Sequence, residues 1–280
     1  MTRLASVPHI SLDDAYMASA LALGRRNLGL TAPNPSVGAL IVKEGVVIGR
    51  GWTGAGGRPH AEVMALKQAG ADALGATLYV TLEPCAHHGV TPPCVDSIIA
   101  AGISRVVSAL EDPNPRVAGQ GHQYLRQSGI ELTVGVCAAM ARLDHMGHIL
   151  RMTHHRPMVT LKLAQTADGY AAGAAYDPRL HITGPVADAF THVQRAMHDA
   201  IMIGAGTARE DDPLMTVRLP GMDNRRPLRI VLDPKLSLSA RSRLVSTAHD
   251  RPLLIVVSED IADEVVLQFK KSSGADVARI

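Results

Sequence analysis

Segments with strand patterns and segments with helix patterns alternate along the first half of the chain, and this alternation limits the folds available to it. Short apolar runs are separated by amphipathic stretches of about ten residues. The predicted strands are 37–43, 46–52, 76–85, 104–110 and 130–136, and the predicted helices are 11–26, 60–70, 94–102 and 121–129. Such an order is typical of an α/β fold, in which a mostly parallel sheet carries helices on its faces.

A second series of α/β segments follows the stretch 138–157, which is predicted as a helix rich in Ala, Met and His, followed by a basic turn and Pro157. The predicted strands of this series are 158–166, 199–206, 227–233 and 252–258, and its predicted helices are 186–197 and 259–274. We therefore expect two domains, residues 1–150 and residues 151–280, a division that suits a chain of 280 residues.

The charge balance and the apolar patterning exclude several classes of protein. The 28 Lys and Arg residues nearly balance the 26 Asp and Glu residues, so we expect no nucleic-acid partner and no membrane surface. No apolar run approaches the ~18 residues of a membrane span, and Asp13 and Asp14 interrupt the region where a signal peptide would be apolar. These features predict a cytoplasmic protein, in which clustered cysteines bind metals or act in catalysis more often than they form disulfides.

Two of the three cysteines, Cys85 and Cys94, lie in the stretch LEPCAHHGVTPPC. Cys85 is expected at the end of a buried strand and Cys94 in the first turn of a helix, while His60 and Glu62 open an earlier helix. One imidazole and two thiolates supply three zinc ligands and leave a fourth position for water, which is the arrangement of catalytic sites.

Zinc lowers the pKa of a bound water towards ~7, and Glu62, which is not a ligand, can carry protons from that water to a leaving amine. His-x-Glu followed by Pro-Cys and a second Cys is the signature of zinc deaminases that act on nucleobases. The sequence therefore predicts His60, Cys85 and Cys94 as zinc ligands and Glu62 as the catalytic acid–base.

Other interpretations of these residues remain open. A structural zinc clip would use His87 or His88 as a fourth ligand, and the domain would then be a zinc-stabilised binding module without turnover. A deaminase of tRNA adenosine is a further alternative, but the near-neutral charge and the eight residues between the two cysteines, AHHGVTPP, argue against it. Cys137 is interpreted as a small buried apolar residue.

With these motifs in place, the sequence resembles the RibD family, bifunctional enzymes of riboflavin biosynthesis in which a pyrimidine deaminase is fused to a pyrimidine reductase. The resemblance rests on PNPSVGALIV, HAEVMAL, VTLEPCAHHGVTPPC and EDPNPRVAGQG, and it extends beyond residue 230. It implies a cytidine-deaminase-like three-layer α/β/α domain followed by a dihydrofolate-reductase-like α/β domain.

The resemblance also implies a deaminase substrate, 2,5-diamino-6-ribosylamino-4-pyrimidinone 5′-phosphate. By match to the family, Asn34, His87, Asp112 and Asn114 bind it. Taken without the family, each of these residues has a plainer interpretation, as part of a turn or of loop packing. Val90 departs from the pattern, because the family has Lys or Arg there as a phosphate contact.

In the second domain the resemblance implies an NADPH-dependent reductase that converts the ribosyl group to ribityl. The residues implied for the reductase substrate are Lys162, Arg195, Met215 and Arg218, and those implied for NADPH are Ala164, Thr207 and Asp211. Lys162 is expected on the strand predicted at 158–166.

The family pattern continues past the last residue, Ile280, through a glycine-rich segment that wraps the cofactor. The second domain is therefore expected to be C-terminally incomplete, and an enzyme that only deaminates is the alternative to a bifunctional one. Because the reductase has exposed strands, we expect a homodimer or homotetramer. The other expected partners are small molecules, the pyrimidine ribosyl phosphates that serve as substrates.

Overall fold

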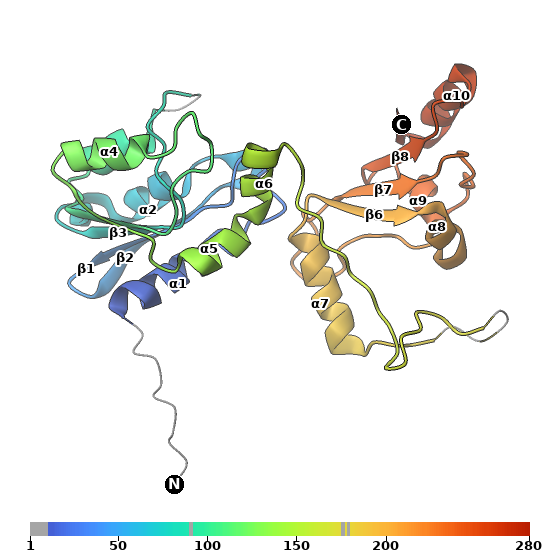
Figure 1. Ribbon diagram of the computed structural model, residues 1–280, viewed down its shortest axis with the longest axis horizontal. Coiled ribbons are helices and arrows are strands. Elements are labelled where there is room, and N and C mark those ends of the chain that lie inside the picture. Colours follow the sequence, from blue (N-terminus) through green and yellow to red (C-terminus); the bar gives the residue numbers. More distant parts are fainter. Residues whose placement is uncertain (1–10, 90–91, 175–176, 178–179) are drawn as a thin grey trace, which may run out of the picture. The chain divides into compact units, whose positions relative to one another are not determined.

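The computed structural model describes residues 11–89, 92–174, 177 and 180–280, so Val90 lies outside the described residues. The chain divides into two compact units, Met1–Thr160 and Leu161–Ile280 (Figure 1). Among the described residues, no helix combines the length and the apolar character that a membrane crossing requires.

The first unit is built around a five-stranded sheet with the order β2-β1-β3-β4-β5. β1 pairs antiparallel with β2 and β3, whereas β3, β4 and β5 are parallel. The strands are β1 (Gly38–Lys43), β2 (Val46–Trp52), β3 (Thr77–Val80), β4 (Arg105–Ser108) and β5 (Glu131–Val134). The predicted mostly parallel sheet is thus a mixed one, because the hairpin β1–β2 joins it antiparallel.

Helices cover both faces of this sheet. They are α1 (Leu12–Arg25), α2 (Ala61–Ala69), α3 (Cys94–Ala100), α4 (Gln120–Gln127), α5 (Ala138–Asp144) and α6 (Met146–His154), with two short 3-10 helices, η1 (Ala55–Gly57) and η2 (Gly70–Ala73). Figure 1 shows α2 and α4 on one face and α1 and α5 on the other. The three-layer α/β/α architecture expected of this domain is confirmed.

The first elements form where local signals predict them. α1 begins at a capping box in which the Asp14 backbone N–H donates to Ser11 Oγ at 3.1 Å and the Ser11 backbone N–H donates to an Asp14 carboxylate oxygen at 3.3 Å. β1 and β2 turn at Glu44 and Gly45, which both have positive φ, as a tight hairpin requires.

Two glycines let helices lie directly on the sheet. A Cβ atom added at Gly38 in β1 would lie 1.8 Å from the carbonyl oxygen of Ala20 in α1. A Cβ atom at Gly51 in β2 would lie 1.9 Å from the carbonyl oxygen of Ala61 in α2. No larger residue fits at either position, and the second contact fixes the start of α2 against the sheet.

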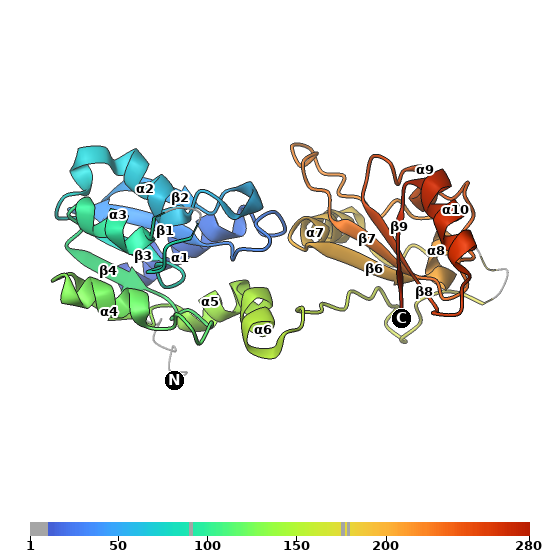
Figure 2. The same ribbon diagram turned by 90° about the horizontal axis from the view of Figure 1, so that it is seen from above.

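The second unit contains a parallel four-stranded sheet with the order β6-β7-β8-β9, which can be followed in Figure 2. Its elements are α7 (Pro185–Ala196), β6 (Ala200–Gly204), α8 (Ala205–Asp211), β7 (Leu228–Leu232), α9 (Arg243–Ser246), β8 (Leu253–Val257), α10 (Asp263–Ser273) and β9 (Asp276–Arg279). Val231, Leu244 and Ile255 lie at the centre of its apolar core.

Three predictions about secondary structure are wrong. The strand predicted at 158–166 does not form; Val159 and Leu161 in this segment are 73% and 86% exposed. The single helix predicted within 138–157 is two helices, α5 and α6, which meet at His145. The strand predicted to reach Cys85 ends at Val80. Local apolar patterns predict these elements, whereas the pairing of a strand with its neighbour and the point at which a helix is interrupted depend on tertiary contacts.

Candidate active site

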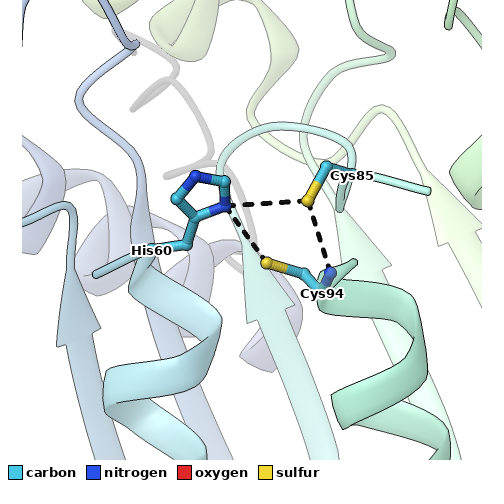
Figure 3. A group of neighbouring side chains, drawn as sticks. All are labelled: His60, Cys85 and Cys94. Atoms are coloured by element: carbon cyan, nitrogen blue, oxygen red, sulfur yellow. Dashed lines mark hydrogen bonds between the residues drawn. The ribbon is translucent and has the colours of Figure 1, made fainter. Parts of the chain in front are cut away.

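The three predicted zinc ligands converge at the ends of different elements of the first unit. His60 is the N-cap residue of α2, Cys94 is the first residue of α3, and Cys85 lies in the loop after β3. His60 Nδ1 lies 3.2 Å from Cys94 Sγ and 3.6 Å from Cys85 Sγ, and Figure 3 shows the three side chains pointing toward one another. Residues separated by up to 34 positions in sequence thus form one cluster.

This donor set fits zinc. Zinc bonds of about 2.3 Å to sulfur and about 2.0 Å to nitrogen separate tetrahedral ligand atoms by roughly 3.6 Å, close to the distances between His60 Nδ1 and the two sulfur atoms. The ligand atoms of His60, Cys85 and Cys94 all lie within 4.8 Å of one another. Three protein donors leave one tetrahedral position for another ligand, as in catalytic zinc sites.

The two thiols cannot both ionise easily without a cation beside them. Hydrogen bonds from the Cys94 side chain, from His60 and from the Cys94 backbone lower the pKa of Cys85 to about 4, against the opposing effect of burial. The pKa of Cys94 is raised well above its ordinary range by its hydrogen bond to Cys85 and by burial. A divalent ion between the sulfurs would remove this conflict, since it stabilises both thiolates.

Glu62 lies in the first turn of α2, two residues after His60, and its side chain is buried. Burial raises its pKa to about 7, although a hydrogen bond involving Cys94 and the charge of His60 act in the opposite direction. A carboxyl group with a pKa near neutrality can both accept and return a proton at physiological pH. Its position beside the ligands, and not among them, is the one predicted for the acid–base.

The residues predicted to bind the deaminase substrate lie in three loops of the same unit. Asn34 Nδ2 donates to the carbonyl oxygen of Gly57 at 3.0 Å. Gly57 precedes His60 by three residues, so this bond ties Asn34 to the segment that leads to His60. The backbone N–H of Asn114 donates to Asp112 Oδ1 at 2.8 Å. Burial raises the pKa of Asp112, and the charge of His87 lowers it, so His87 and Asp112 interact electrostatically.

Sequence reasoning did not select two side chains that belong to this region. The charge of His148, in α6, acts on Asp112 and lowers its pKa. Glu83, two residues before Cys85, is buried and accepts the backbone N–H of Asp112 at 2.9 Å. A charged residue within the run predicted as a buried strand, 76–85, is the only sequence signal for Glu83, and nothing in the sequence points to His148.

In the second unit the structure brings Arg195, Arg218 and Met215 together around Thr216. Arg195 Nη1 donates to the Thr216 carbonyl oxygen at 3.1 Å, and Arg218 Nη1 donates to Thr216 Oγ1 at 3.3 Å. Burial and the charge of Arg218 lower the pKa of Arg195. Two guanidinium groups that donate to the same residue, Thr216, form a positive site that suits a phosphate group.

The remaining four residues predicted for the reductase lie outside the strands of the sheet. Thr207 and Asp211 are exposed on α8, directly after β6, at the carboxyl end of a parallel strand where nucleotides bind in open α/β sheets. Lys162 and Ala164 lie in the segment 157–165, which forms no helix or strand. The placement of Lys162 on a strand is therefore wrong.

Comparisons with known proteins match both units. Residues 10–110 match a family model described as the cytidine and deoxycytidylate deaminase zinc-binding region, and residues 157–280 match the RibD C-terminal domain. The riboflavin biosynthesis protein RibD of Aquifex aeolicus is 44% identical over 89% of this chain, and that of Escherichia coli is 43% identical over 83% of it.

Solved structures agree with the sequence relatives. One form of RibD from Acinetobacter baumannii has a TM-score of 0.82 at 37% identity. The match covers 96% of this chain and 73% of the Acinetobacter baumannii chain. A diaminohydroxyphosphoribosylaminopyrimidine deaminase/5-amino-6-(5-phosphoribosylamino)uracil reductase from Thermotoga maritima has a TM-score of 0.81 at 35% identity, with coverages of 96% and 80%. The matched region spans 69% and 66% of the two curated relatives, about two thirds of their length.

Proposed function

The chain belongs to the RibD family, and from that premise we propose that it is a bifunctional enzyme of riboflavin biosynthesis. Residues 1–150 deaminate 2,5-diamino-6-ribosylamino-4(3H)-pyrimidinone 5′-phosphate with Zn²⁺. Residues 151–280 reduce the ribosyl group of 5-amino-6-(5-phosphoribosylamino)uracil to ribityl with NADPH. The observation that carries the proposal is the convergence of His60, Cys85 and Cys94 beside the buried acid Glu62.

Deamination follows from the chemistry of these side chains. Zinc, when bound by His60, Cys85 and Cys94, acidifies a water molecule and so supplies the nucleophile. Glu62, whose pKa is about 7, accepts the proton of the nucleophile and delivers it to the leaving amine. Its burial keeps bulk water away from this transfer.

The substrate is held by polar groups of the surrounding loops. The Asn34 carboxamide can both donate to and accept from the edge of a pyrimidine ring. Asp112 and Asn114 bind the exocyclic amine and the sugar hydroxyls, and the imidazole of His87 binds the ribose phosphate. Asn34 and Asp112 are already oriented by hydrogen bonds to Gly57 and Asn114, which lowers the cost of ordering them on binding.

In the second unit, Arg195 and Arg218 bind the substrate phosphate and Met215 packs beside them, with Lys162 completing the substrate side. Ala164, Thr207 and Asp211 line the cofactor, and NADPH supplies the hydride when bound. The site at Thr216 supports this assignment because two guanidinium groups donate to the same residue, one to its carbonyl oxygen and one to its hydroxyl.

One observation favours deamination alone as a second candidate. Lys162 and Ala164 lie in a segment outside the sheet, whereas Arg195 lies on α7 and Thr207 and Asp211 lie on α8. A zinc-stabilised module without turnover is disfavoured, since a structural clip would need a fourth protein ligand and the described cluster contains three.

We also propose a homodimer or homotetramer in the cytoplasm. β6 is an edge strand of the second sheet as described, and Met202 on it is 55% exposed, so a second copy could cover this edge. Three free thiols, two of them arranged as metal ligands, suit a reducing compartment. Light scattering on the purified protein would measure the oligomeric state.

A two-stage assay tests the bifunctional proposal. Zinc-loaded protein is given the diaminopyrimidine substrate and ammonia release is measured; NADPH is then added and its oxidation is followed. Ammonia release followed by NADPH oxidation supports both activities. Ammonia release without NADPH oxidation selects the deaminase alone, and no ammonia release contradicts the proposal.

A further inference from the structure

Glu83 occupies an unusual position between β3 and the zinc ligand Cys85. Its side chain is only 2% exposed, yet its carboxylate is saturated with hydrogen bonds. All of them come from backbone N–H groups: Oε2 accepts from Asp112 at 2.9 Å and Gly119 at 2.9 Å, and Oε1 accepts from Gly121 at 2.7 Å and His122 at 3.2 Å.

These four donors lie at both ends of the segment 112–122, so one carboxylate closes the whole segment into a loop. Two of the donors are in the first turn of α4, whose N-cap residue, Gly119, has no side chain to cap it. Glu83 therefore satisfies N–H groups that would otherwise lack partners at the start of this helix. A buried carboxylate accepting several N–H groups is a strong, directional anchor.

The close packing of Gly121 supports the same interpretation independently. A Cβ atom at this position would lie 2.0 Å from the carbonyl oxygen of Pro84 and 3.1 Å from Glu83 Oε1. The start of α4 thus rests directly on the segment that leads from Glu83 to Cys85, and only glycine permits that approach.

We propose that Glu83 is a positioning residue for deamination, because it sets the distance between Asp112 and the zinc ligand Cys85. The inference rests on the proposed function, in which Asp112 and Asn114 contact the substrate. Glu83 holds the Asp112 backbone, and Asp112 Oδ1 in turn accepts the N–H of Asn114. Because Glu83 and Cys85 are two residues apart on one segment, the substrate loop and the metal loop move as one body.

A second metal site is the alternative use of the same side chains. Ligand atoms of Glu83, Glu111 and His122 lie within 4.8 Å of one another. Both oxygens of Glu83, however, already accept two N–H groups each, and the positive ends of these N–H groups would repel a cation. The hydrogen bonds therefore assign this carboxylate to the loop. A measured metal content above one ion per chain in the parent protein, decreasing in Glu111→Gln, would overturn this assignment.

The variant Glu83→Gln tests the proposal, because an amide replaces one acceptor oxygen by an NH2 group that faces N–H donors. We expect zinc to stay at one per chain, and kcat/KM for deamination to fall about 10- to 100-fold, mainly through KM. Reduction of the deaminated substrate by the same protein should be unchanged. The matched control is Glu111→Gln, an exposed glutamate next to Asp112, which should deaminate normally.

A double-mutant cycle separates positioning from general stability. If Glu83 acts through Asp112, Glu83→Gln adds little to the KM increase already caused by Asp112→Ala. Additive effects, or a loss of kcat with unchanged KM, would overturn the proposal.

Hydrogen exchange provides a measurement that does not depend on activity. Amides of 112–122 should exchange faster in Glu83→Gln than in the parent protein, while those of α2 should not. If Glu83→Gln does not fold, Glu83→Asp, which keeps the charge but shortens the reach, should show the same local exchange. Normal protection in the folded variant refutes the anchor, whereas absent ammonia release by the parent protein refutes only the proposed function.

Discussion

The sulfur of Cys85 accepts a hydrogen bond from the backbone N–H of Cys94 at 3.3 Å. The first turn of α3 therefore supplies a donor to one proposed zinc ligand, Cys85, and carries a second proposed ligand, Cys94. Because the backbone holds the two cysteines at this spacing, the loop between them can be long without separating the sulfurs. The spacing of the two sulfur atoms is thus set at the start of α3.

Replacing Cys94 by serine should remove most of the zinc. A serine hydroxyl is a poorer zinc ligand than a thiolate, and two remaining donors do not hold the ion. Metal analysis of the purified variant measures this. Cys137→Ser is the control, because Cys137 Sγ lies 3.7 Å from Asp14 and is not part of the cluster; full zinc content in Cys94→Ser would contradict the ligand assignment.

Glu62→Gln should keep zinc and lose at least about 100-fold in the rate of ammonia release, because glutamine cannot move protons. In the parent enzyme the carboxylate is the form that accepts a proton. Since its pKa is about 7, kcat/KM should fall as the pH decreases below that value. The exposed Glu44, replaced by glutamine, is the control. A variant Glu62→Gln with near-normal ammonia release would place the acid–base elsewhere.

His145 should make the first unit less stable in mild acid. It is 2% exposed, its Nε2 lies 3.1 Å from Thr81 Oγ1, and burial lowers its pKa from 6.5 to about 4. The folded state thus binds fewer protons than the unfolded state between these pH values. Its stabilising contribution is complete above pH 6.5 and is lost as the pH falls towards 4, in total about 3 kcal/mol.

Denaturant unfolding of His145→Gln between these pH values measures the effect. The difference in unfolding free energy between the variant and the parent protein should vary with pH. The exposed His155, replaced by glutamine, is the control. A pH-independent difference for His145→Gln would show that this imidazole does not titrate on unfolding.

Arg229→Met should destabilise the second unit alone. The side chain is 1% exposed, and its guanidinium donates to Thr247 Oγ1 at 2.8 Å and to the Arg251 carbonyl oxygen at 2.6 Å. Methionine fills the space but leaves several buried acceptors without donors, at a cost of roughly 3 kcal/mol or more. Calorimetry should show one transition shifted and deamination retained; Arg209→Met, an exposed contact to Ser237, is the control.

Arg218→Gln should weaken reduction without affecting deamination. The variant loses one of two guanidinium groups at Thr216, so KM for the phosphorylated substrate should rise by about tenfold or more, since a hydrogen bond to a charged group contributes ~1.5–3 kcal/mol. NADPH oxidation measures it. Arg226→Gln, elsewhere in the unit, is the control. An unchanged KM would remove Arg218 from the phosphate site.

Much of the first unit was predictable from sequence because its signals are local. Ser11 and Asp14 cap α1 through bonds between neighbours, and Glu44 and Gly45 turn the hairpin through their own backbone angles. The spacing of His60 and Glu62, followed by the two cysteines, identifies the zinc chemistry, since the residue types alone define the donor set.

Tertiary structure decided what depends on distant neighbours. The apolar alternation around Lys162 predicts a strand, but a strand forms only where another strand pairs with it, and the described sheet ends at β6. Likewise, only folding brings the carboxylate of Glu83 to N–H groups 29 to 39 residues away. Local residue types therefore determine which chemistry the chain can perform, whereas long-range hydrogen bonds and packing determine where its substrate-binding groups stand.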